Sequence, residues 1–127
     1  MKNEKQNPIV IVGNVLSGRG IGKEIGFPTI NVFYDGKISG VYAGEVVFRR
    51  KIFKAAIHVG SKPTVSPYGV SCEAHILNFG GEIGHGDKVK IKIEAKIRDT
   101  RKFENLYELK KVIANDIEFT KKYYKID

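Results

Sequence analysis

The sequence predicts a mainly β domain, built as a small antiparallel barrel or sandwich and followed by one C-terminal helix. Three observations support this fold class. Short runs rich in β-branched and aromatic residues recur between residues 9 and 97, with Gly and Pro between them. One of these runs alternates strictly between apolar and charged residues. Near the C-terminus the spacing of apolar residues changes to three and four, which is typical of a helix.

Five segments are typical of strands. In the clearest, Lys88 to Ile97, apolar residues alternate with lysine and glutamate in period two, so one face is expected to be buried and the other wet. The other four are Ile9 to Val15, Val41 to Arg49, Ile52 to Val59 and Ser71 to Phe79. The short gap at Arg50 and Lys51 indicates a hairpin. We interpret the lysine row as a solvated face, because no aromatic residues interleave with it to stack on nucleic acid bases.

The C-terminal helix is predicted over residues 105–124. Its apolar face is formed by Leu106, Leu109, Val112, Ile113, Ile117, Thr120 and Tyr124. Asn105 is expected to cap the first turn, with Glu108 three residues later completing a capping box. Lysines in the last turns suit the negative end of the helix dipole.

Length and composition limit the possible functions. The 127 residues allow one domain, and 42% hydrophobic with 28% charged residues is typical of a folded, soluble protein. No apolar run approaches the roughly 20 residues of a membrane helix, and the polar lead over residues 1–8 lacks a signal core, which predicts a cytoplasmic location. The single cysteine, Cys72, excludes an intramolecular disulfide and is expected to be a buried thiol. A net charge of +8 favours anionic ligands without choosing among them.

A glycine-rich stretch over residues 13–31, GNVLSGRGIGKEIGFPTIN, is the most unusual part of the sequence. Glycines let backbone amides approach a phosphate, and Arg and Lys contact its oxygens, so the stretch is either a phosphate cradle or a flexible surface loop. It matches neither the P-loop nor the GxGxxG pattern. The residues of such a cradle are Gly18, Arg19, Gly20, Gly22, Lys23 and Gly26.

Two side chains directly after Pro28 are candidate metal ligands. Thr29 and Asn31 point the same way if this segment is extended. Their oxygens either cap a turn or complete the coordination of Mg²⁺ held by phosphate oxygens and water.

The third feature is Glu73, which lies in a predicted strand with His75, Leu77 and Phe79 as its expected same-side neighbours. This carboxylate either pairs with a lysine or accepts a proton from a substrate hydroxyl as a general base. The histidines are too scattered along the sequence to predict a zinc site formed by the protein alone.

Taken together, these segments resemble the riboflavin kinase family. The strings GRGIGKEIGFPTIN, GVYAG, GSKPTV, CEAHIL and IRDTRKF, then the final helix, occur in the order and spacing of that family over nearly the whole chain. The resemblance implies a small closed six-stranded antiparallel β-barrel with a C-terminal helix, as one kinase domain over residues 1–127. It also implies transfer of the γ-phosphoryl group of ATP to the 5′-hydroxyl of riboflavin, which yields FMN.

The resemblance further implies a role for each candidate residue. Glu73 is expected to be the general base, and Thr29 and Asn31 are expected to bind magnesium, with zinc or manganese as alternatives. Arg98 and Phe103 are expected on the riboflavin side of the site. The nucleotide-binding residues implied by the resemblance are Gly18, Arg19, Gly20, Gly22, Lys23, Gly26, Pro28 and Thr29.

The chain departs from the family's pattern at two places. Where the family usually has an acidic residue, an apolar residue and Tyr-Gly, this chain reads Glu82-Ile83-Gly84-His85, which changes a loop expected to support the nucleotide. Thr100 stands where the family often has an acidic residue, two positions after Arg98. The predicted catalytic residues are unaffected.

An alternative function is a catalytically inactive, flavin-binding or RNA-binding regulatory barrel, favoured by the positive charge and the two departures. The main prediction is a monomeric kinase that binds riboflavin and ATP, releases FMN and ADP, and uses neither nucleic acid nor a membrane as a partner. The adenylyltransferase half that precedes this kinase in many bacteria does not fit into 127 residues, so a monofunctional kinase is expected.

Overall fold

The computed structural model describes residues 8–16, 29–34, 36–61, 70–80, 82–84 and 86–126. The described elements are β1 (Ile9–Asn14), β2 (Thr29–Phe33), β3 (Gly40–Phe48), β4 (Lys51–Ser61), β5 (Val70–Ile76), β6 (Lys88–Arg98) and α2 (Leu106–Tyr124). The six strands form one sheet in the order β1-β6-β3-β4-β5-β2, and every neighbouring pair is antiparallel. The mainly β fold with one C-terminal helix is therefore confirmed.

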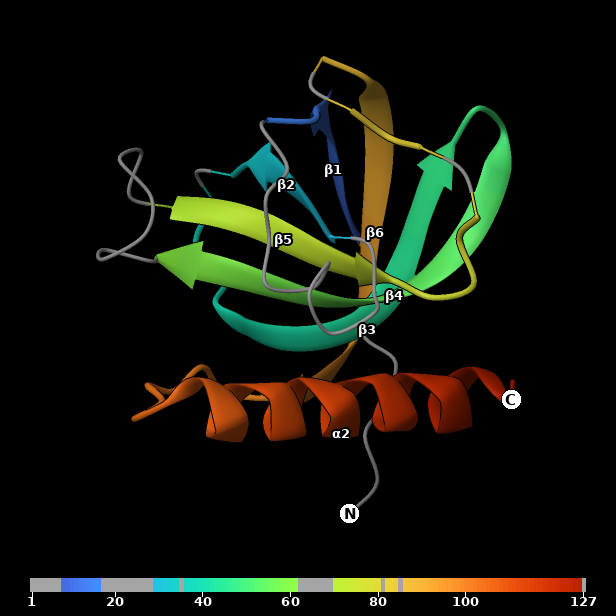
Figure 1. Ribbon diagram of the computed structural model, residues 1–127. Helices are drawn as coiled ribbons and strands as arrows, with labels where there is room; N and C mark the ends of the chain where they lie inside the picture. Colours follow the sequence, from blue (N-terminus) through green and yellow to red (C-terminus); the bar gives the residue numbers. More distant parts are fainter. Residues whose placement is uncertain are drawn as a thin grey trace.

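The sheet curls into a half-barrel, and α2 lies across its outer side (Figure 1). The edge strands β1 and β2 meet at an isolated bridge between Val15 and Val32 and at a hydrogen bond from Leu16 N to Asn31 O of 2.8 Å. No ladder joins these two strands within the described residues, so the expected closed barrel is not confirmed and the sheet is an open half-barrel.

The inner face of the half-barrel holds the main core. All six strands contribute apolar side chains to it, including Ile11, Ile30, Val46, Ile57, Ile76 and Ile91. Cys72 is 0% exposed in this core, which confirms the prediction of a buried thiol. Because alternate residues of a strand face opposite sides, this core also determines which side chains face outward.

The β3–β4 hairpin turns one residue earlier than predicted, at Arg49 and Arg50. Their φ angles of 51° and 69° lie in the left-handed region. Two consecutive residues of this kind form a two-residue turn whose twist matches that of the flanking strands.

Strand β5 ends at Ile76, three residues before the predicted end at Phe79. The chain turns at Leu77 and Asn78, and Asn78 has a φ of 55°. Phe79 therefore packs against the inner core and not, as expected, on the same side as Glu73. Asparagine tolerates the left-handed region better than most residues, which explains why the strand stops here.

The alternation in β6 holds only for its first half. The register against β3 shifts between Ala43 and Gly44, and again between Val41 and Tyr42. Such a bulge changes the face to which the following residues point. Glu94 and Ala95 are consequently both buried, and the prediction of one buried and one wet face is wrong beyond residue 93.

The predicted helix is confirmed as α2, which begins at Leu106 with Asn105 as its N-cap. The Asn105 side chain accepts a hydrogen bond of 2.9 Å from Glu108 N, the first half of the expected capping box. Ile113 and Ile117 pack on the outer face of the sheet, whereas Leu106 is 45% exposed. No helix in the described part of the chain is long and apolar enough to cross a membrane.

Candidate active site

Four polar side chains come together on the outer face of β2 and β5. The register of these strands places Asn31 opposite Glu73 and Thr29 opposite His75. The residues between them in each strand belong to the inner core, so these four residues lie on the opposite face. The predicted base and both predicted magnesium ligands therefore share one small area of the sheet.

His75 links the two strands within this area. Its Nδ1 atom lies 3.1 Å from Thr29 Oγ1, which is hydrogen-bond distance, and its Nε2 atom lies 4.0 Å from Glu73 Oε1. The side chains of His75 and Glu73 are 8% and 18% exposed. On the other side of β5, His58 of β4 is the register partner of Glu73. The carboxylate thus lies in a largely dry position on β5, between His58 of β4 and Asn31 of β2.

The oxygen donors on β2 suit a magnesium ion. A hydroxyl from Thr29 and a carboxamide from Asn31 are neutral, hard oxygen ligands, spaced about 6.6 Å along one face of the strand. Mg²⁺ usually takes only one or two protein ligands together with phosphate oxygens and water. No group of three or more His, Cys, Asp or Glu residues is arranged to hold a metal within the described ranges. The donor set therefore fits a cation that arrives with a nucleotide.

Most of the predicted nucleotide-binding residues lie outside the described residues. These are Gly18, Arg19, Gly20, Gly22, Lys23, Gly26 and Pro28. The described chain stops at Leu16, whose backbone N donates to Asn31 O, and resumes at Thr29. The two described residues that flank the undescribed part of the glycine-rich stretch therefore lie at the predicted magnesium ligands, Leu16 bonded to Asn31 and Thr29 a predicted ligand itself.

The two predicted riboflavin-binding residues lie where β6 leads into α2. Arg98 donates two hydrogen bonds of 2.9 Å to the buried carboxylate of Asp116 on the helix. The ring of Phe103 lies 5.9 Å from the guanidinium carbon of Arg98 and 4.9 Å from that of Arg101. Arg98 therefore fastens the helix to the sheet, and contact of either residue with riboflavin stays a prediction.

One departure from the family pattern lies partly within the described residues. Gly84 is exposed, and a Cβ atom added there meets nothing within 4 Å. A side chain can therefore begin at this position without meeting a described neighbour, while His85 lies outside the described residues. The Asp87 side chain accepts from Gly84 N at 2.9 Å, which holds this turn together.

A second polar cluster lies under the C-terminal half of α2. Glu45 accepts a hydrogen bond from Lys54 and lies 3.6 Å from Lys92, while the Tyr124 hydroxyl donates to Glu94. Burial alone raises the pKa of Glu45, but Lys54 and Lys92 outweigh it and hold this pKa below its ordinary value. Burial, followed by the bond to Glu94, raises the pKa of Tyr124 above its ordinary value. Charges here are compensated within the protein.

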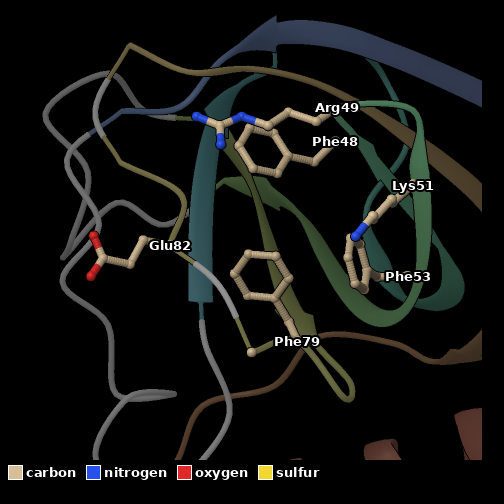
Figure 2. A pocket seen from close by; sticks show the side chains of 7 residues that line it. Phe48, Arg49, Lys51, Phe53, Phe79 and Glu82 are labelled. Carbon is tan, nitrogen blue, oxygen red and sulfur yellow. The ribbon is translucent and has the colours of Figure 1, made fainter.

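A pocket of about 390 Å³ opens elsewhere, on the inner side of the sheet beside the β3–β4 hairpin (Figure 2). It is lined by Phe48, Arg49, Lys51, Phe53, Phe79, Gly80 and Glu82. The rings of Phe53 and Phe79 meet edge to face at 4.9 Å, and both pack against the inner core. Since Glu73 and His75 lie on the opposite face of the sheet, the pocket is separate from the polar cluster.

The sequence analysis did not include His58 or His75 among the site residues. His75 stands two positions after Glu73, which did indicate a shared face. Its contact with Thr29 joins residues 46 positions apart and depends on the register of β2 with β5, which no local pattern reveals.

Similarity to known proteins identifies the family of this chain. The profile of the riboflavin kinase family matches residues 5–124. The chain belongs to the flavokinase family. This flavokinase chain is 35% identical over 114 residues to the bifunctional riboflavin kinase/FMN adenylyltransferase of Escherichia coli K12, covering 87% of the chain and 36% of the relative. It is 34% identical over 122 residues to the RNA-binding riboflavin kinase RibR of Bacillus subtilis, covering 92% of the chain and 52% of the relative.

A solved structure supports the flavokinase fold. The riboflavin kinase from Trypanosoma brucei superposes with a TM-score of 0.62 and 23% identity, over 93% of this chain and 80% of that one. At this identity the likeness shows the fold alone. The flavokinase chain spans about a third of the length of the Escherichia coli relative and about half of the length of the Bacillus subtilis relative, so the activities of those whole proteins do not transfer by similarity.

Proposed function

We propose that this chain is a riboflavin kinase, which transfers the γ-phosphoryl group of ATP to the 5′-hydroxyl of riboflavin and yields FMN and ADP. The observation that carries the proposal is the pairing of Asn31 with Glu73 across β2 and β5. Paired strands lie about 4.8 Å apart, so a base and a magnesium ligand stand side by side. Membership of the flavokinase family supports the choice of substrates.

In this proposal Glu73 is the general base. Its carboxylate accepts the proton of the riboflavin 5′-hydroxyl while that oxygen attacks the γ-phosphorus, and the bond from this phosphorus to the β,γ-bridging oxygen of ADP breaks. Phosphoryl transfer of this kind depends mainly on alignment and on stabilisation of charge. The low exposure of Glu73 supports this role, because a largely dry carboxylate keeps water from competing for the transferred group.

Magnesium, when bound, neutralises the phosphate charges during the transfer. Thr29 and Asn31 are the residues that would hold it, through neutral oxygens that leave most of the coordination to the phosphates. The glycine-rich segment would add backbone amides around those phosphates. The described residue before this segment, Leu16, donates to Asn31 O, and the described chain resumes at Thr29, which supports that placement.

Phe103 is the better candidate of the two for direct contact with the flavin ring. Arg98 already directs two of its nitrogens to Asp116, and a third, Nη1, donates to Asp99 O at 3.1 Å. The half-buried Phe103 ring presents an aromatic face at the start of the helix. We therefore assign ring stacking to Phe103 and its support to Arg98.

A second candidate function is RNA binding by a catalytically inactive barrel. The Bacillus subtilis relative carries RNA binding in its name, and this chain has a net charge of +8. Lys88 and Lys90 are exposed on the outer face of β6, which supports contact with phosphates. RNA binding that weakens steeply with salt, together with no transfer of phosphate, would favour this function over the kinase.

The kinase proposal is tested by incubating the chain with riboflavin, Mg²⁺ and a nucleoside triphosphate, followed by chromatographic detection of FMN. ATP, CTP and GTP are compared in parallel, because no described residue predicts which base is selected. We expect FMN with ATP. Flavin binding without product from any triphosphate would support a binding module, and absence of both product and flavin binding would contradict the proposal.

A further inference from the structure

His75 lies close to both halves of the proposed site, the oxygen donors of β2 and the carboxylate of Glu73. It lies opposite Thr29 in the β2–β5 register and on the same face as Glu73. Its two ring nitrogens point in different directions, Nδ1 to the threonine hydroxyl at 3.1 Å and Nε2 to the carboxylate at 4.0 Å. The His75 side chain is 8% exposed, so protein atoms and not solvent surround most of the imidazole.

We propose that His75 is a positioning residue, which orients a magnesium ligand with one nitrogen and the general base with the other. This inference rests on the proposed kinase function. Residues that hydrogen-bond to a metal ligand without touching the metal set the orientation of that ligand and its affinity for the metal. In this site the single side chain of His75 orients both the ligand Thr29 and the general base Glu73.

One neutral tautomer of the imidazole satisfies both contacts. The Thr29 hydroxyl donates its hydrogen to Nδ1, which leaves the lone pairs of Thr29 Oγ1 directed away from the ring and available to a cation. The proton of the ring then lies on Nε2, where it is directed at Glu73 Oε1. A distance of 4.0 Å is too long for a hydrogen bond in the free protein, and contacts of this kind commonly tighten when substrate binds.

In this arrangement the two carboxylate oxygens of Glu73 have different roles. In the proposal Oε1 faces His75, and Oε2 accepts the proton of the substrate hydroxyl. Because β5 separates β4 from β2 in the sheet, His58 flanks Glu73 without bridging to Thr29. The bridging role therefore belongs to His75 alone among the two histidines that adjoin Glu73.

Two substitutions test the contact of His75 with Thr29 and its contact with Glu73 separately. In His75→Asn the amide lies near the position of Nδ1 and still accepts from Thr29, whereas in His75→Gln it lies near Nε2 and still donates toward Glu73. We expect His75→Asn to keep the Mg²⁺ dependence of nucleotide binding while kcat falls about 10-fold to 100-fold. We expect His75→Gln to keep more of kcat, while the Mg²⁺ concentration needed for half-maximal ADP binding rises by about 10-fold to 100-fold.

The readouts are kcat with saturating riboflavin and ATP, and ADP affinity measured by titration calorimetry over a series of Mg²⁺ concentrations. His58→Asn and His58→Gln form the matched control pair, because His58 also adjoins Glu73 but does not contact Thr29. These two variants should not differ from each other in which readout they change, kcat or the Mg²⁺ dependence of ADP binding. If both His75 variants lose kcat and Mg²⁺-dependent binding by the same factor, the histidine only fills space and the inference is wrong. An inactive wild-type chain would instead contradict the kinase function itself.

A measurement on the unsubstituted protein covers the case in which the His75 variants fail to fold. The ¹⁵N chemical shifts of the imidazole report which nitrogen carries the proton in the neutral ring. The proposal predicts the Nε2–H tautomer for His75. A proton on Nδ1 would overturn it, since Thr29 could then no longer donate to that nitrogen.

Discussion

Two regions on the outer face of the same sheet differ in what surrounds their acidic side chains. Under α2, the buried carboxylate of Asp116 receives two hydrogen bonds from Arg98, and the buried Glu94 receives one from Tyr124. On β2 and β5, Glu73 is 18% exposed and stands 4.0 Å from His75, beside the oxygen donors of β2. One region is covered by the helix, and the other carries the proposed site.

This difference indicates how a fold separates structural charges from functional ones. A charge that is removed from water must be compensated, or it destabilises the folded state. Where the helix supplies the compensating partner, the pair fastens two elements and serves stability. Where the neighbours of a carboxylate are an imidazole and neutral oxygen donors, the group keeps the capacity to take up a proton and to face a cation.

The largest effect expected is on catalysis, for Glu73→Gln. Loss of a general base lowers kcat by about 10² to 10⁴-fold, while nucleotide binding and folding should persist because glutamine has the same shape. Rates of FMN formation measure the loss. Glu118→Gln on the exposed side of α2 is the matched control and should leave the rate unchanged. Equal rates for wild type and Glu73→Gln would remove Glu73 from the mechanism.

The next largest effect should fall on stability, for Asp116→Asn. This change leaves Arg98 beside a neutral amide, and breaking one partner of a largely buried pair costs about 3 kcal/mol. Urea unfolding followed by circular dichroism measures the free energy of unfolding. Below the unfolding range, kcat with saturating riboflavin should stay close to that of wild type, because Arg98 supports the Phe103 ring and takes no part in the proposed proton or phosphoryl transfer. A large loss of kcat with little loss of stability would reverse the roles that we assign to the two regions.

A smaller loss is expected for Tyr124→Phe, which removes only the hydroxyl that donates to Glu94. A hydrogen bond to a charged group contributes about 1.5 to 3 kcal/mol, and the remaining ring keeps its contact with Lys54 at 4.3 Å. Thermal unfolding measures the effect. An unchanged melting temperature would mean that this contact does not fasten the helix end.

The smallest effect is a pH dependence at Glu45. Its pKa is lower in the folded state than its ordinary value of 4.5, so its carboxylate stabilises the fold above that pH. The contribution disappears as the pH falls through the folded-state pKa. Glu45→Gln should therefore cost about 1 kcal/mol at pH 7 and progressively less below pH 4.5. Urea unfolding of both proteins at several pH values tests this, and a constant difference would contradict the lysine pairing.

Local signals were sufficient for most of the fold. Period-two alternation and turn residues identified five strands, and the spacing of three and four identified α2. The local pattern does not predict strand β2. Its five residues follow a glycine-rich stretch, and they alternate between core and polar positions over too short a run to be recognised. The bulges in β6 depend on β3 across the sheet, and no pattern within β6 itself reveals them.

The candidate site was only partly predictable for the same reason. Residue type and the family resemblance singled out Thr29, Asn31 and Glu73, but their proximity depends on a register between strands some forty residues apart. His75 enters the site through that register. For Asp116 a signal did exist, since it lies three residues after Ile113 on the buried face of the helix, where an acidic residue requires a partner.

The central claim is that Mg²⁺ and the nucleotide bind on the β2–β5 region and that the polar cluster under the C-terminal half of α2 serves stability. Amide chemical shifts of the labelled chain during titration with Mg²⁺ and ADP test it most directly. The account predicts that the large changes fall at Asn31, Glu73 and their strand neighbours, while Glu94 and Tyr124 change little. Changes centred on the aromatic pocket of Phe48, Phe53 and Phe79, or on the C-terminal half of α2, would contradict it.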